Sequence, residues 1–161
     1  MKKQEVIIMK RTKLLFIFIP VFLMLLTAAL EAGNGWGIGF MVGNPTGLSF
    51  KAWTGKTRAF DAGAAWAFGD QDKLQLHADY LFHNYRVIKV ESGQLPFYVG
   101  IGARVKFEKD TRVGVRIPVG LCYLFKNHPI DIFFEVVPII DLAPETEMDM
   151  NVALGIRYFF K

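Results

Sequence analysis

Residues 150–161 read MNVALGIRYFFK, and this stretch decides the fold of the chain. Counting back from Phe160, every second residue is apolar or aromatic, and most of the residues between them are small or polar. Successive side chains of a β-strand point to opposite faces, so this alternation predicts a strand with one apolar face. The apolar positions are Met150, Val152, Leu154, Ile156, Tyr158 and Phe160.

The same alternation recurs upstream, and no segment after residue 33 has helical periodicity. Segments rich in Gly, Pro, Asn and Asp separate the alternating runs, as turns do. Several runs have 11 or more residues, whereas strands of soluble sheets usually have about five or six. A tilted membrane strand has about 9–11 residues. The pattern predicts eight strands, at 36–43, 48–54, 58–68, 73–85, 95–107, 112–125, 130–142 and 149–160.

The two faces of the predicted strands differ sharply in composition. One face is continuously apolar, with Ile38, Phe40, Val99, Ile101, Ile132, Phe134 and Ile156 among its residues. The other face mixes charged residues with glycines such as Gly39, Gly63, Gly102, Gly114, Gly120 and Gly155.

This composition tells a membrane barrel from a soluble one. A soluble barrel would turn its apolar face inward and carry polar residues outside, but the chain has only two serines after residue 33, Ser49 and Ser92. Glycine on an exposed strand face packs nothing, whereas inside a narrow barrel it leaves room for long charged side chains. We therefore expect the apolar face to meet lipid, with a soluble barrel as the alternative. The predicted fold is all-β: an eight-stranded antiparallel up-and-down transmembrane β-barrel.

Aromatic residues gather at the ends of the predicted strands. With an even number of strands, both ends of the barrel chain lie at one rim. Membrane barrels carry aromatic girdles at both interfaces, which supports the predicted orientation. We expect Trp36, Phe82, Phe97, Phe125 and Phe160 at the rim of the chain ends, and Trp66, Phe68 and Phe107 at the other.

The first 32 residues have a different character. A basic segment is followed by an unbroken apolar run from Leu14 to Ala29 and then by small residues. These features predict a cleaved helical signal peptide at 1–32, before a barrel domain at 33–161. Cleavage after Ala29 and cleavage after Ala32 both fit, and Met9 is an alternative start to Met1. An uncleaved anchor is the other interpretation, but a helix that spans a bilayer takes about 20 residues.

Net charge and cysteine content exclude some functions. Residues 33–161 hold 14 Lys and Arg (19 minus five) and 13 Asp and Glu (15 minus two), so their net charge is only +1. The basic character of the whole chain therefore belongs to its first residues and does not indicate nucleic-acid binding. Cys122 is the only cysteine, so no intramolecular disulfide or cysteine-based metal cluster is expected.

The C-terminal alternation resembles the assembly signal of outer-membrane barrels, from which Lys161 departs by one residue. The whole of 33–161 resembles the OmpA-type class of small eight-stranded outer-membrane barrels. This resemblance implies that the chain ends face the periplasm. It also implies a monomer that contacts outer-membrane lipids and lipopolysaccharide, and that uses periplasmic chaperones and the barrel-assembly machinery during biogenesis.

Charged residues on the inner face form the main polar constellation. Pairing across the predicted turns places Lys51 opposite Asp61, His77 opposite Arg104, and Glu135 opposite Arg157. Buried charge is costly unless paired, so we expect a salt-bridged plug, with a gated ion path as the alternative. The predicted lumen network is Lys51, Asp61, His77, Asp79, Arg104, Lys106, Arg116, Asp131, Glu135, Asp141 and Arg157.

Chemistry beyond this network has little support in the sequence. Ser49 beside His77 and Asp79 is the one conceivable catalytic set, and its members would need hydrogen-bond contact. The histidines are dispersed, so no metal site and no cofactor is expected. The favoured role is a non-enzymatic structural or interaction barrel of the envelope. A small-solute channel comes second, and an enzyme acting on lipid A a distant third.

Two prolines interrupt the predicted strands. If Asn127-His128 is a turn, Pro118 lies opposite Val137, and Pro138 is at nearly the same level. Proline donates no ladder hydrogen bond and usually marks an edge or a bulge. We therefore predict a bulge or a gap in pairing there. The alternative is that each proline directs its missing donor away from the shared seam.

Overall fold

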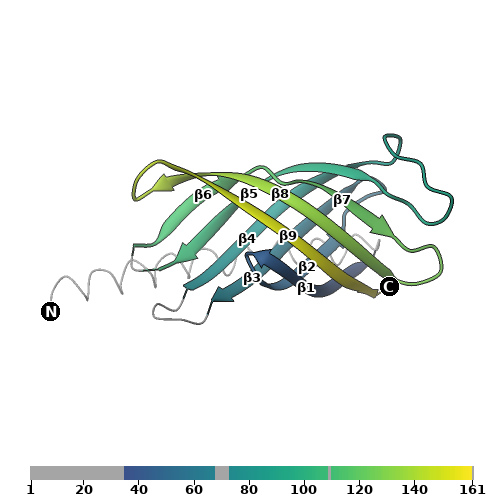
Figure 1. Cartoon of the computed structure of the whole chain (residues 1–161), viewed down its shortest axis with the longest axis horizontal. Helices are drawn as coiled ribbons and strands as arrows, with labels where there is room; N and C mark the ends of the chain where they lie inside the picture. The colour runs from purple at the N-terminus through teal and green to yellow at the C-terminus, as the bar shows by residue number, and fades with distance from the viewer. Residues whose placement is uncertain (1–34, 68–72, 109, 161) are drawn as a thin grey trace, which may run out of the picture.

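A computed structural model describes residues 35–67, 73–108 and 110–160 of the chain. The predicted signal peptide, the aromatic residue Phe68 and the loop 69–72 lie outside these residues. The described residues form antiparallel strands (Figure 1), and none of them forms a helix long and apolar enough to cross a membrane. The strands are β1 (Trp36–Asn44), β2 (Gly47–Trp53), β3 (Arg58–Ala67), β4 (Lys73–Asn84), β5 (Phe97–Phe107), β6 (Arg112–Arg116), β7 (Val119–Leu124), β8 (Ile130–Ala143) and β9 (Glu147–Phe160).

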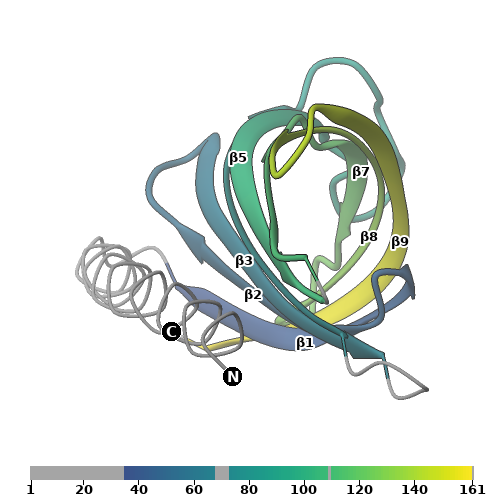
Figure 2. The ribbon, with the colours of Figure 1, turned by 90° about the vertical axis from the view of Figure 1, so that its left-hand side faces the viewer.

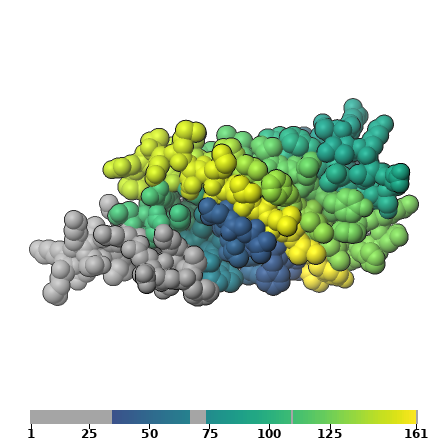
Figure 3. Space-filling view, viewed as in Figure 1, coloured from purple at the N-terminus to yellow at the C-terminus, as the bar shows by residue number. Residues whose placement is uncertain are grey.

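The strands form one sheet that closes into a ring, as Figure 2 shows along the barrel. Strands next to each other in sequence pair antiparallel, apart from β6 and β7, and β9 closes the ring by pairing with β1 from Trp36↔Phe160 to Asn44↔Val152. The closing strands lie side by side on the outer surface (Figure 3). The all-β barrel prediction is therefore confirmed.

The predicted sixth strand, 112–125, differs from the expectation, because it is divided into β6 and β7. Both pieces pair with β5 on one side and with β8 on the other. The wall thus has eight strand positions, as predicted, and nine strands. The division falls at Ile117 and Pro118, so the predicted gap in pairing at the proline is confirmed on this strand.

The two prolines lose hydrogen bonds in different directions. Gly100 donates its amide to the Pro118 carbonyl (2.8 Å), and Ile117 donates its amide to the Pro138 carbonyl (3.0 Å). The reciprocal bonds cannot form because proline has no N–H. Pro118 thus directs its missing donor toward β5, away from the shared seam, whereas Pro138 directs its own into that seam. Strand β8 nevertheless continues through Pro138, and the register shift beside β8 lies at Val113 and Gly114.

The inner and outer faces are those that the alternation predicts. Phe40, Ile101 and Phe134 on the outer face are 66%, 60% and 47% exposed, whereas Arg104 and Arg116 on the inner face are 0% exposed. The predicted C-terminal positions Val152, Leu154, Ile156, Tyr158 and Phe160 all face outward.

Aromatic rings reinforce the closure between β1 and β9. At the rim of the chain ends, the Trp36 ring stacks on Phe160 with centroids 4.6 Å apart, and Tyr158 contacts Phe160 edge-on at 5.1 Å. The last strand therefore closes the ring with side chains as well as with its backbone.

Candidate functional site: the charged lumen

Alternate positions of the strands carry a buried polar network into the barrel. The predicted residues are all buried except Lys106, whose side chain is 25% exposed near the rim of β5. The sequence reasoning missed several other polar residues of the lumen. These are Gln75, His83, Tyr98, Cys122, Asn151 and, toward the rim, Asp149.

Arg157 on β9 organises the level nearest the chain ends. Its Nε and one terminal nitrogen donate to the two oxygens of Asp131, at 2.9 and 3.0 Å. Its other terminal nitrogen donates to Asp61 and, at 3.3 Å, to the Ser49 hydroxyl. The guanidinium also lies 4.1 Å from the centre of the Phe133 ring. One arginine therefore joins β9 to β8, β2 and β3.

Arg116, the last residue of β6, organises the middle level. Its Nε lies 3.1 Å from both oxygens of Asp79 on β4. Its terminal nitrogen lies 3.6 Å from Glu135 on β8, an ion pair too long for a hydrogen bond. Glu135 accepts a hydrogen bond from the Tyr98 hydroxyl at 3.0 Å.

Arg104 on β5 organises the level nearest the opposite rim. It binds Asp141 with two hydrogen bonds, from Nε at 3.1 Å and from a terminal nitrogen at 2.7 Å. The same terminal nitrogen donates to Asp149 at 2.7 Å. Arg112 continues this network outward, because it pairs with Glu147 and lies 3.7 Å from Asp141.

Several of these contacts share a geometry in which the partners lie two strands apart, with a glycine directly between them, whereas the Arg157–Asp131 pair joins direct register partners. Arg104 and Asp141 both pair with Gly114, and Arg116 and Asp79 both pair with Gly102. A Cβ at Gly102 would lie 1.9 Å from an Asp79 oxygen, so the carboxylate occupies the space that glycine leaves. The same relation joins Tyr98 to Glu135 across Gly120, and Arg157 to Ser49 across Gly39.

The observed contacts and registers correct the predicted ion pairs. Lys51 and Asp61 are register partners, as are His77 and Arg104, so these two predicted registers are confirmed. The Asp61 carboxylate, however, binds Arg157 and not Lys51. The prediction that Glu135 faces Arg157 is wrong.

The error in that pair is one of register. Glu135 lies opposite Ala153, and Arg157 lies opposite Asp131. Strand β9 starts at Glu147 and β8 ends at Ala143, so the connection is shorter than the predicted loop 143–148. The shorter connection shifts the register by four residues.

Lys51 occupies a pocket of mixed chemistry beside Cys122. Its ammonium lies 2.8 Å from His83 Nε2, 3.9 Å from the Cys122 sulfur and 4.0 Å from Asp131. The Trp53 ring lies 4.5 Å from the same nitrogen. The Cys122 thiol donates to Asp131 at 3.1 Å. Cys122 and Lys51 are both 0% exposed, so neither group meets solvent in the closed barrel.

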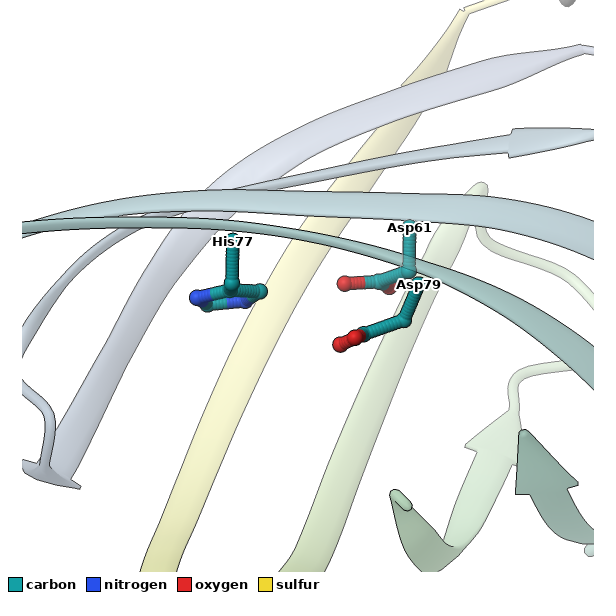
Figure 4. A group of neighbouring side chains, drawn as sticks. All are labelled: Asp61, His77 and Asp79. Carbon is teal, nitrogen blue, oxygen red and sulfur yellow. The ribbon is translucent and has the colours of Figure 1, made fainter. Parts of the chain in front are cut away.

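Asp61, His77 and Asp79 form a group that the sequence reasoning missed. One nitrogen or oxygen from each lies within 4.8 Å of the others, and all three are buried. Figure 4 shows the two carboxylates directed toward the imidazole ring. The available signal was the spacing of His77 and Asp79 on one face of β4, combined with Asp61 on the paired strand. The prediction had considered histidine and cysteine ligands alone.

The conceivable catalytic set is not assembled as such a set requires. Ser49 on β2 and His77 on β4 both face the lumen. Both pair in register with Gly63, which lies between them on β3. The Ser49 hydroxyl accepts a hydrogen bond from Arg157 at 3.3 Å, and among the described residues no hydrogen bond joins it to His77, the base that such a set needs.

Comparison with known proteins places the chain in a family. The model of the family described as "Protein of unknown function (DUF3996)" matches residues 28–160. The chain belongs to this family. No curated protein matches its sequence significantly. Among solved structures, the DUF3996 chain is similar to the N-terminal β-barrel domain of Pseudomonas aeruginosa OprF, with a TM-score of 0.63 and 14% sequence identity. The likeness covers 79% of this chain and 98% of that domain, and it shows a shared barrel fold.

Proposed function

We propose that this DUF3996 protein is an integral outer-membrane β-barrel of the OmpA-like kind, with a sealed lumen and a structural or interaction role in the envelope. One observation carries the proposal: the barrel is apolar outside and charged inside. Large apolar side chains are exposed on the outer face of β1, β5, β8 and β9, whereas a water-soluble barrel would expose charged side chains on that face. The fold shared with the OprF domain supports the same location.

The orientation and contacts follow from this placement. The rim that carries Trp36 and Phe160 faces the periplasm, and the rim of Arg112 and Glu147 faces outward. Outer-membrane lipids contact the apolar face, and lipopolysaccharide contacts the outer rim. Periplasmic chaperones and the assembly machinery act during biogenesis, and the outward-facing positions of β9 from Val152 to Phe160 are the segment that the machinery would read.

The buried network favours a plug over a channel. Arg104, Arg116 and Arg157 lie at successive levels, each at most 2% exposed and each bound to carboxylates on other strands. An ion passing the barrel would have to break these pairs in a medium of low dielectric constant, where a broken buried pair costs about 3–5 kcal/mol. We propose a non-conducting and non-enzymatic role.

Conductance in planar bilayers tests the sealed lumen. The wild-type barrel should give no single-channel steps, while a variant with Arg116→Ser and Asp79→Ser should give steps because its middle level is removed. If the wild-type protein gives single-channel steps at the same frequency as the variant, the lumen is a small-solute channel and not a plug. Fractionation with heat-modifiable gel migration tests location, and a mass shift of lipid A on overexpression would reveal an enzyme.

A further inference from the structure

Two carboxylates face each other inside the barrel, and among the described residues each is bonded to a different arginine. Asp61 on β3 and Asp79 on β4 are direct register partners, 7% and 3% exposed. Like charges directly opposite each other destabilise a strand pair, and a buried charge without compensation is costly. This pair therefore requires positive charge close by.

The neighbouring basic residues supply too little of it. Arg157 is shared between Asp61 and Asp131, and Arg116 is shared between Asp79 and Glu135. Lys51 is the third buried cation of this region, 4.0 Å from Asp131. Among the described residues, four carboxylates thus face three cations, a balance of −1. The buried pair of Arg104 and Asp141 adds one charge of each sign, so the buried lumen residues keep this balance of −1.

His77 supplies a nitrogen ligand beside these oxygens. It is 3% exposed, and its Nδ1 has no hydrogen-bond partner among the described residues. The ring lies across Gly63, where a Cβ would come within 2.6 Å of Nε2. The glycine therefore gives the imidazole its place next to the carboxylates, which point toward it in Figure 4.

We propose that Asp61, His77 and Asp79 bind one divalent transition-metal ion of the Zn²⁺ class inside the barrel. Imidazole nitrogen with carboxylate oxygens suits Zn²⁺ better than Mg²⁺ or Ca²⁺, which prefer oxygen alone. A cation at this position also offsets the excess negative charge of the buried lumen residues.

The geometry requires only small side-chain movements. Bonds of about 2.0–2.2 Å to a tetrahedral Zn²⁺ place the ligand atoms about 3.4 Å apart, and these atoms now lie within 4.8 Å of one another. Arg157 binds Oδ2 of Asp61, so Oδ1 of that carboxylate is available to the ion. Arg116 can keep one oxygen of Asp79 while the ion takes the other. The two arginines then orient the metal ligands, as second-layer partners do in metal sites.

The ion would tie β3 to β4 within the lumen. Because the lumen is sealed, it enters while the barrel folds. The site depends on the barrel fold alone and not on the envelope role, so conductance or location data cannot decide it.

Metal analysis of the folded protein tests the site. The untagged protein is folded into detergent micelles with equimolar Zn²⁺ and excess Mg²⁺, desalted, and measured for metal content. The wild-type barrel should retain about one Zn²⁺ per chain. His77→Gln should retain less than a tenth of that, and Asp61→Asn should lose metal similarly. His83→Gln is the matched control, because His83 is a buried lumen histidine that binds Lys51 and lies outside the group.

Cobalt provides a second readout that folding defects do not imitate. Co²⁺ loaded in the same way should give the visible absorption bands of a Co²⁺ ion with a low coordination number in the wild-type and His83→Gln barrels. His77→Gln should give no such bands. Heat-modifiable migration shows that each variant has folded. Folded wild-type protein without Zn²⁺, protein that retains Mg²⁺ instead, or His77→Gln with a full complement of Zn²⁺ would each overturn the proposal. In the first case a proton, not a metal, supplies the missing charge.

Discussion

The strongest test of the lumen geometry is a double-mutant cycle on Arg104 and Asp141. These side chains are 0% and 1% exposed and share two hydrogen bonds, of 3.1 and 2.7 Å. Arg104→Met leaves the Asp141 carboxylate buried, with only Arg112 nearby at 3.7 Å. Breaking a buried pair costs about 3–5 kcal/mol, and Arg112 places this variant near the lower end of that range.

The other single variant should cost less. Asp141→Leu leaves Arg104 with its 2.7 Å hydrogen bond to Asp149, which is 33% exposed and partly solvated. Losing hydrogen bonds to a charged partner costs about 1.5–3 kcal/mol. The double variant removes both charges, and replacing a buried pair by apolar residues is often close to neutral. The single effects should therefore exceed the double effect by about 2 kcal/mol or more.

Reversible urea unfolding in lipid vesicles measures these free energies. The control is the cycle of Arg104 with His77, its direct register partner on β4. That coupling should stay below about 0.5 kcal/mol, since non-interacting sites add within that margin. If Arg104 couples to His77 and not to Asp141, contacts across an intervening glycine do not organise the lumen.

Three further outcomes are expected. Gly102→Ala should destabilise the barrel by about 1–3 kcal/mol in urea unfolding, because its Cβ would lie 1.9 Å from Asp79, whereas Gly55→Ala meets no atom within 4 Å and should be neutral; equal effects would contradict the packing. Deleting residues 158–161 should abolish heat-modifiable folding while export continues, since β9 then loses its pairs with the start of β1; a truncated barrel that migrates normally would refute this. Cys122 should react with a maleimide only after unfolding, because a buried thiol is inert; rapid labelling of the folded barrel would show that the lumen opens.

The sequence predicts the wall of this barrel well because the wall depends on local patterns. Alternation assigns each side chain to a face, and turn residues set most registers. Centring the turn on Asn127 and His128 correctly places Pro118 opposite Val137, in line with the observed pair Val119↔Val136. The exception is the connection between β8 and β9, where Glu147 and Met148 belong to the strand and not to the loop.

Contacts inside the lumen were harder to predict because several of them skip a strand, although Arg157 and Asp131 are direct neighbours. The prediction paired each charge with its direct neighbour, as in a flat sheet. In a closed barrel the inward side chains converge, and a glycine between two long side chains lets them meet. A glycine opposite charged residues on both neighbouring strands, such as Gly102 or Gly114, is therefore the pattern to seek once the register is known.

This rule also explains how the barrel tolerates its interrupted strand. At the break between β6 and β7, two ladder hydrogen bonds are missing because Pro118 and Pro138 have no N–H to donate. On either side of this break, inward-facing side chains of the neighbouring strands contact one another in the lumen. Arg116, just before it, binds β4 and approaches Glu135 on β8, and Tyr98 on β5 reaches Glu135 across β7. The strands that flank the break are thus held together from within, so the polar lumen compensates for backbone bonds that the sequence cannot make.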